Sequence, residues 1–130
     1  MSLLTDDDVA LLNEPQLAHV ATVHADGTPH VTPVWVDTDG EHVIFNTAKG
    51  RVKFENIARN PMVAISVVDK ANDYRTLWLQ GRAEVDEEGA DAHIDKLAKK
   101  YLGKDSYPFR QPGEVRVIVR VTPTAKLGHG

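Results

Sequence analysis

Short segments in which apolar and polar residues alternate recur along this chain, and the alternation predicts a protein built mainly from strands. VRVIVRV at 115–121 alternates most regularly, and TLWLQGRAEV at 76–85 places most of its apolar residues on one face. MVAISVVD at 62–69 is a nearly continuous apolar run of strand length. The expected strands are 17–25, 29–37, 42–48, 62–69, 76–85 and 115–121.

Helices are expected before and between these strands. Thr5 and Asp8 form a capping pattern ahead of an apolar stretch, which predicts a short opening helix. A second short helix is expected at about 50–60, where a following proline stops it. A longer helix is expected at 87–102, because apolar residues recur there on one stripe.

This order of elements predicts a small six-stranded antiparallel barrel with peripheral helices, in a single domain spanning 1–130. The dipeptides Asp26-Gly27 and Asp39-Gly40 are typical of the tight turns that join antiparallel strands. No repeat, low-complexity tract or linker divides the chain. Strand edges, and Trp78 on an otherwise polar face, make self-association an expectation.

The composition narrows the possible partners. The 130 residues are 42% hydrophobic and 26% charged, with a net charge of -4, which argues against nucleic acid as the main partner. No apolar run approaches the roughly 20 residues that cross a bilayer. The acidic N-terminus is unlike a secretory signal, so a cytoplasmic location is expected. Without cysteine the chain has no disulfide and no thiolate nucleophile.

One basic segment, NTAKGRVKFENIARNP at 46–61, runs against this acidic background. Its charged residues are Lys49, Arg51, Lys53, Glu55 and Arg59. A strand that leads directly into a helix presents free backbone N-H groups and a positive dipole end, which suit a phosphate. Thr47 and Gly50 would add a hydroxyl and close backbone approach. A solvated surface helix would have the same composition, so the two interpretations remain open.

Two further features have both a functional and a structural interpretation. Pro33 lies within an expected strand, which places it at an edge or a bulge. With Thr32 and Val34, that edge could expose backbone to a flat ligand, or it could be an ordinary edge. Trp78 and Gln80 could reach a partner subunit or a cofactor held between subunits, or they could be surface residues of a monomer.

No residue stands out as catalytic or as a metal ligand. The six histidines show no HxH or HExxH spacing, and Ser66 lies in an apolar strand without a GxSxG context. Neither a P-loop nor a GxGxxG motif is present. The loop at 101–114, rich in aromatic residues and proline, could wall a binding cleft or could simply close the barrel.

Four ordered motifs carry a family resemblance over nearly the whole chain: AxVHADGTPHVTPVW, VIFNTAKGRVKFENIARNP, LQGRAEV and YPFRQPGEVRVIVRVTP. The chain resembles the pyridoxamine phosphate oxidase-like split-barrel flavoproteins, and within them the branch that uses the deazaflavin coenzyme F-420 in place of FMN. The ending TPTAKLGHG lacks the Arg/Trp-bearing tail with which true pyridoxamine phosphate oxidases grip pyridoxal phosphate. Vitamin B6 oxidation is therefore not expected.

The resemblance implies a homodimer of FMN-binding split-barrel type, with two cofactors at the subunit interface. It places the backbone of 30–34 along the tricyclic ring, 46–48 beside the ribityl chain, and Arg51 and Lys53 on the phosphate. Lys49 and Asn56 would be neighbours, with Trp78 and Gln80 as the interface positions named above. The expected cofactor-binding residues are therefore His30, Val31, Thr32, Pro33, Val34, Asn46, Thr47, Ala48, Lys49, Arg51, Lys53, Asn56, Trp78 and Gln80.

The activity implied by the resemblance is hydride transfer between coenzyme F-420 and a small conjugated acceptor such as an enone, an imine or a tetrapyrrole. The cofactor supplies the chemistry, and the protein supplies position and electrostatics. Because no side chain stands out as a general acid, solvent is the expected proton source. Two alternatives remain: an FMN-dependent oxidoreductase of the same fold, and a non-catalytic flavin or tetrapyrrole carrier.

Overall fold

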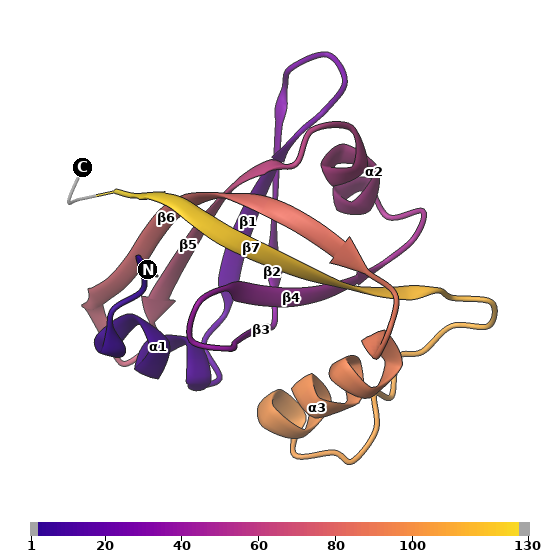
Figure 1. The fold of residues 1–130 in the computed structure, drawn as a ribbon. Helices are drawn as coiled ribbons and strands as arrows, with labels where there is room; N and C mark the ends of the chain where they lie inside the picture. Colours follow the sequence, from indigo (N-terminus) through magenta and orange to yellow (C-terminus); the bar gives the residue numbers. More distant parts are fainter. Residues whose placement is uncertain (1–2, 128–130) are drawn as a thin grey trace.

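The computed structural model describes residues 3–127, whose strands form one seven-stranded antiparallel sheet that curls into a barrel (Figure 1). Across the sheet the strands follow the order β2-β1-β5-β6-β7-β4-β3. Their bounds are β1 Ala18–Val23, β2 Pro29–Val34, β3 Val36–Thr38, β4 Val43–Ala48, β5 Met62–Asp69, β6 Asn72–Asp86 and β7 Arg116–Lys126. The expected mainly β, antiparallel barrel is confirmed, with seven strands in place of six.

The additional strand arises because the segment expected as one strand at 29–37 is divided at Trp35. β2 pairs with β1, whereas β3 pairs with β4 at the opposite edge of the sheet. The two edges are joined by the chain itself rather than by a ladder of hydrogen bonds, and this opens the barrel into a split form. Pro33 lies in the edge strand β2, where the missing N-H group is tolerated.

Two strands are longer than the sequence pattern indicates. β6 already begins at Asn72, so most of the expected polar loop at 70–75 belongs to a hairpin with β5. β7 continues to Lys126, which lies opposite Leu79 of β6. The expected lack of an Arg/Trp-bearing tail concerns 122–130, of which 128–130 lie outside the described residues.

The core fills the barrel, and a smaller cluster lies beneath one helix. Phe45 and Leu79 are fully buried among residues from the other strands. On the opposite face of β4, Ile44 packs with Ala90 and Ile118. Every residue of β4 is therefore buried, because the barrel interior covers one face and the long helix approaches the other.

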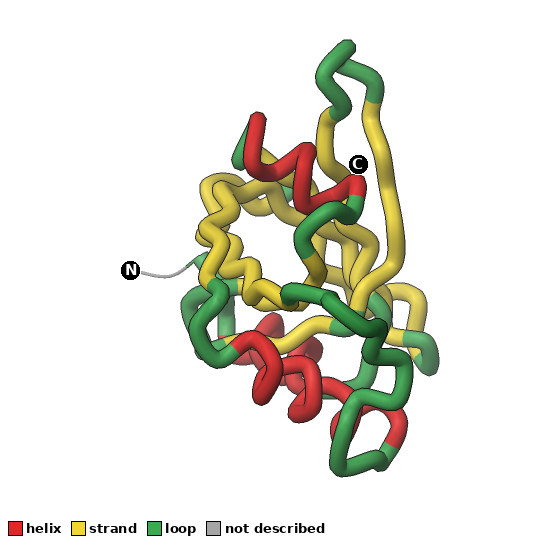
Figure 2. The backbone as a smooth tube through the Cα atoms, turned by 90° about the vertical axis from the view of Figure 1, so that its right-hand side faces the viewer, coloured by secondary structure: helices red, strands yellow, loops and turns green. Residues whose placement is uncertain are grey.

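The helices are α1 Asp6–Asn13, α2 Val52–Arg59 and α3 Ala90–Leu102, and they lie outside the barrel (Figure 2). The capping box expected at the first of them is confirmed: Asp8 N donates to Thr5 Oγ1 at 3.1 Å, and Thr5 N donates to Asp8 Oδ2 at 3.0 Å. The helix expected at 87–102 begins at Ala90. Gly103 ends it with a φ of 72°, a left-handed conformation that favours glycine.

We expect Gly81→Ala to destabilise the barrel. A Cβ atom at this position would lie 2.5 Å from Val121 Cγ1 and 2.6 Å from the backbone oxygen of Thr122. Such overpacking against backbone costs about 1–3 kcal/mol of the free energy of unfolding. Denaturant unfolding would measure the loss, with Arg82→Ala at the exposed next position as the control. Equal stability of the two variants would contradict this prediction.

A second expectation concerns Lys100, whose Nζ donates to the backbone oxygens of Leu12 and Val36 at 2.6 Å each. Burial lowers its pKa to about 8. The unfolded chain therefore binds this proton more tightly, and the Lys100 contribution to the free energy of unfolding rises between pH 8 and the ordinary lysine value of 10.5. We expect Lys100→Met to remove this rise and exposed Lys99→Met to keep it, as measured by denaturant unfolding across that interval.

Candidate functional site

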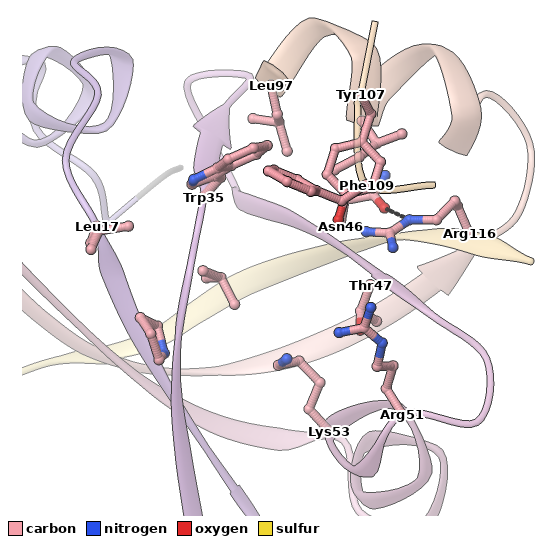
Figure 3. A pocket seen from close by; sticks show the side chains of 13 residues that line it. Leu17, Trp35, Asn46, Thr47, Arg51, Lys53, Leu97, Tyr107, Phe109 and Arg116 are labelled. Carbon is pink, nitrogen blue, oxygen red and sulfur yellow. Dashed lines mark hydrogen bonds between the residues drawn. The ribbon is translucent and has the colours of Figure 1, made fainter. Parts of the chain in front are cut away.

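A cavity of about 290 Å³ opens between the sheet, the start of α2, α3 and the loop that precedes β7 (Figure 3). Segments far apart in the sequence meet there, because β4 forms one wall of the cavity and leads from the barrel into α2. The lining residues are Leu17, Pro33, Val34, Trp35, Asn46, Thr47, Arg51, Lys53, Ile94, Leu97, Tyr107, Phe109 and Arg116.

One end of the cavity is cationic. Arg51 is the N-cap residue of α2 and makes no side-chain capping bond, so the first N-H groups of the helix have no side-chain acceptor at the N-cap. Among residues 3–127, neither Arg51 nor Lys53 forms an ion pair. Burial lowers the pKa of Lys53, and the charges of Arg51 and Arg116 lower it further. An anion bound between these side chains would relieve their repulsion.

Thr47 adds a hydroxyl to the same end. Its side chain is 3% exposed, and Oγ1 is buried without a hydrogen-bond partner among the described residues. Buried hydroxyl groups are normally paired, so this one suits a ligand atom in the cavity. Its side chain and that of Arg51 both line the cavity (Figure 3).

Arg116 occupies another part of the cavity, and the sequence analysis did not identify it as a site residue. It is 6% exposed. Its Nε donates to Asn46 Oδ1 at 2.8 Å and its Nη1 to Glu114 Oε1 at 3.0 Å, while its guanidinium lies 5.2 Å from the ring centre of Tyr107 (Figure 3). The strand pattern at 115–121 treats Arg116 and Arg120 alike. Only the position of Arg116 near the aromatic loop at 101–114 distinguishes it in the sequence.

Aromatic rings form the wall beyond Arg116. Trp35 stacks on Tyr101 at 5.3 Å and meets Tyr107 edge to face at 6.0 Å, and Tyr107 meets Phe109 at 5.7 Å. The contacts that tie the loop to α3 include a bond from Tyr107 N to Asp95 and ion pairs of Arg110 with Asp91 and Asp95. The loop at 101–114 therefore contributes to a cavity wall, one of the two roles open from the sequence.

The profile of the family described as pyridoxamine 5'-phosphate oxidase matches residues 4–127. The chain belongs to this family. The family resemblance in the sequence is therefore confirmed.

Two relatives of this pyridoxamine 5'-phosphate oxidase family member are similar over most of its length. F420H(2)-dependent biliverdin reductase of Mycobacterium tuberculosis (strain CDC 1551 / Oshkosh) is 34% identical over 128 residues, which are 96% of this chain and 88% of the relative. The solved structure of an F420 reductase is 39% identical, with a TM-score of 0.79, over 91% of this chain and 94% of that chain.

A more distant solved structure supports the fold alone. HutZ, the heme storage protein of Vibrio cholerae, is 17% identical, with a TM-score of 0.65, over 96% of this chain and 92% of that chain. At this identity the shared feature is the split barrel, and nothing about the ligand of this chain follows from it.

The cofactor-binding residues expected from the family divide into two groups. Those that line the cavity are Pro33, Val34, Asn46, Thr47, Arg51 and Lys53. Those that do not are His30, Val31, Thr32, Ala48, Lys49, Asn56, Trp78 and Gln80. The cationic end thus contains both expected phosphate contacts, whereas the expected ring contacts extend along β2 beyond the cavity.

Several residues outside the cavity have structural partners of their own. Asn56 is buried, donates to Thr22 Oγ1 at 3.0 Å and accepts from Arg59, so it fixes α2 against β1. Lys49 pairs with Glu87 at 2.7 Å on the surface. Ala48 is buried at the end of β4. The packing and contacts of the chain itself explain the positions of these three residues, and no ligand is needed to do so. Their expected role in binding a cofactor therefore rests on the family resemblance.

Trp78 and Val31 line a second hollow of about 390 Å³ that is formed by residues of β1, β2, β5 and β6 together with Leu127, and Gln80 lines a third. His30 Nδ1 and Thr32 Oγ1 are buried without a hydrogen-bond partner among the described residues. A contact from these positions to a cofactor between two subunits, and the homodimer itself, stay predictions.

Residues 3–127 contain no group of three or more histidine or acidic residues arranged to hold a metal ion. Their helices are all too short or too polar to cross a membrane.

Proposed function

We propose that this protein is a coenzyme F-420-dependent reductase, with a small conjugated molecule as the hydride acceptor. Two relatives with 34% and 39% identity, one named as an F420H(2)-dependent biliverdin reductase and the other as an F420 reductase, support the coenzyme and the reaction class. Among enones, imines and tetrapyrroles, the first relative's name makes an open-chain tetrapyrrole such as biliverdin the acceptor to test first.

The observation that carries this proposal is the cationic end of the cavity, where Arg51 and Lys53 have no ion-pair partner within residues 3–127. Arg51 can bind a phosphate through a bidentate fork, Lys53 adds a second charge, and Thr47 offers a buried hydroxyl. Coenzyme F-420 has a phosphate group and also an acidic tail, and this tail could lie along the basic start of α2. When bound, the reduced coenzyme supplies the hydride.

The remaining residues of the cavity can orient a flat acceptor. Trp35, Tyr107 and Phe109 present ring faces and edges against which a conjugated system can stack. Tyr101 is not placed to donate a proton there, since its hydroxyl donates to Gln16 O at 2.6 Å and burial raises its pKa to about 12. Solvent remains the proposed proton source, and no catalytic side chain is assigned.

The test begins with cofactor-free protein titrated in parallel with coenzyme F-420 and with FMN, followed by fluorescence anisotropy. We expect selective binding of the deazaflavin and then steady-state oxidation of the reduced coenzyme by biliverdin. Selective binding of FMN would favour an FMN oxidoreductase of the same fold. Tight binding of coenzyme F-420 without turnover of any enone, imine or tetrapyrrole would favour a carrier.

A further inference from the structure

Behind the cavity a series of polar side chains runs from the surface of α3 to Arg116. Lys96 Nζ donates to Asp37 Oδ2 at 2.9 Å, and the same oxygen lies 3.6 Å from His93 Nε2. On its other side, the His93 ring lies 3.1 Å from the amide nitrogen of Asn46. Asn46 in turn accepts the 2.8 Å bond from Arg116 Nε. Asp37, His93, Asn46 and Arg116 together are called the positioning chain.

The donors and acceptors of the positioning chain allow one consistent arrangement. His93 Nε2 has no hydrogen-bond partner among the described residues, and the ionised Asp37 Oδ2 lies 3.6 Å away, at ion-pair rather than hydrogen-bond distance. The negative charge favours a proton on Nε2, which leaves Nδ1 as an acceptor. Asn46 Nδ2 can then donate one hydrogen to His93 and the other to Ala90 O, at 2.9 Å. Its amide oxygen is thereby directed towards Arg116.

The charge at the far end of the positioning chain is stable. Burial alone would raise the pKa of Asp37, but its interactions with His93, Lys96 and the backbone N-H of Thr38 hold it well below the usual range. Asp37 therefore stays ionised at neutral pH, and its side chain is only 10% exposed. A buried carboxylate that never contacts the cavity has no evident role in binding a ligand directly.

Arg116 has a free donor at the other end. Nε and Nη1 are occupied by Asn46 and Glu114, whereas Nη2 has no hydrogen-bond partner among residues 3–127. The guanidinium reaches into the cavity from β7 (Figure 3). Two nitrogens of the guanidinium are held by hydrogen bonds, and the guanidinium lies over the Tyr107 ring. It therefore loses little freedom when the third nitrogen binds an anion.

We propose that Asp37 and His93 are positioning residues, which act through Asn46 to hold Arg116 in the orientation that binds an anionic group in the cavity. Neither residue lines the cavity, and the sequence analysis named neither. The identity of the ligand as coenzyme F-420 rests on the proposed function, but the effect of His93 on Arg116 does not.

The test compares two substitutions of His93. His93→Leu removes the acceptor for Asn46, whereas His93→Asn places a side-chain oxygen near the position of Nδ1. In ligand-free protein we expect His93→Leu to shift the Nε-Hε NMR resonance of Arg116, identified by its loss in Arg116→Lys, and His93→Asn to keep it near the wild-type value. Asp37→Asn, which changes the charge but little of the shape, should shift the resonance in the same direction as His93→Leu.

The same variants are then titrated with coenzyme F-420. Loss of one oriented charge-assisted contact should weaken binding by about tenfold in His93→Leu, with recovery to within about twofold in His93→Asn. His42→Leu is the matched control, because the His42 ring also contacts an aspartate, Asp39 at 2.7 Å, but lies outside the cavity. Thermal unfolding shows that each variant compared is folded.

Three outcomes would decide the matter. An unchanged Arg116 resonance in His93→Leu, or equal weakening of binding in His93→Leu and His93→Asn, would overturn the positioning role. If wild-type protein fails to bind coenzyme F-420, the proposed function is wrong. In that case the Arg116 resonance is titrated with inorganic phosphate: a weaker response in His93→Leu than in His93→Asn still supports the positioning chain, and equal responses overturn it.

Discussion

The double substitution Arg51→Ala/Lys53→Ala should lower the affinity for coenzyme F-420 by about a hundredfold. This loss is at the lower end of the range expected for removing two charged hydrogen bonds, because Arg51 is exposed to solvent. Both side chains line the cationic end of the cavity and neither has an ion-pair partner among the described residues, so no internal ion pair is lost with them. The dissociation constants of the variant and the wild type, from fluorescence anisotropy, measure the effect.

Lys70→Ala is the control for this loss of positive charge. Lys70 is exposed at the turn between β5 and β6, outside the cavity, and its backbone N-H rather than its side chain makes the observed bond to Gln16. We expect its affinity to stay within about twofold of the wild type, since distant exposed charges are screened by salt. A similar loss in both variants would mean that net charge, and not the cavity, attracts the coenzyme.

Phe45→Ala should cost about 3–5 kcal/mol of the free energy of unfolding, the usual range for deleting a fully buried aromatic ring. Phe45 is 0% exposed at the centre of the barrel, opposite Val119 of β7 and Val36 of β3. The ring is surrounded by strands whose pairing restricts collapse, so the cavity left behind would remain. Chemical denaturation at neutral pH measures the change.

Phe109→Ala provides the matched comparison, because Phe109 is 59% exposed and lies in the loop that walls the cavity. We expect a change in stability below about 1 kcal/mol, since little apolar surface is lost from the core. Its effect should appear instead in the affinity for a flat ligand. Equal destabilisation by the two substitutions would show that the loop, and not the barrel core, supports the fold.

The family relationship was accessible from the sequence because its motifs are local and ordered. The basic run at 46–61 and the strands that follow it come in a definite order along the chain, and each motif is recognisable without its spatial neighbours. The cofactor-binding roles assigned through that resemblance remain predictions. Of these residues, Arg51 and Lys53 have the clearest geometric support, whereas Asn56 and Lys49 have partners within the chain.

The sequence by itself determined the strand periodicity, the capping box at Thr5 and the concentration of positive charge at α2. These features depend on residues within a few positions of one another, so a one-dimensional pattern contains them. It did not determine the break at Trp35, because the two halves of that segment differ only in the strands they pair with, β1 and β4.

The tertiary structure alone decided which polar groups share a site. Arg116 and Asn46 are 70 positions apart, and His93 and Asn46 are 47 apart, yet all three meet behind one cavity. Their contacts follow from the pairing of β4 with β7 and from the packing of α3 beside them. Closure of the barrel fixes such distances, and local propensity carries no information about them.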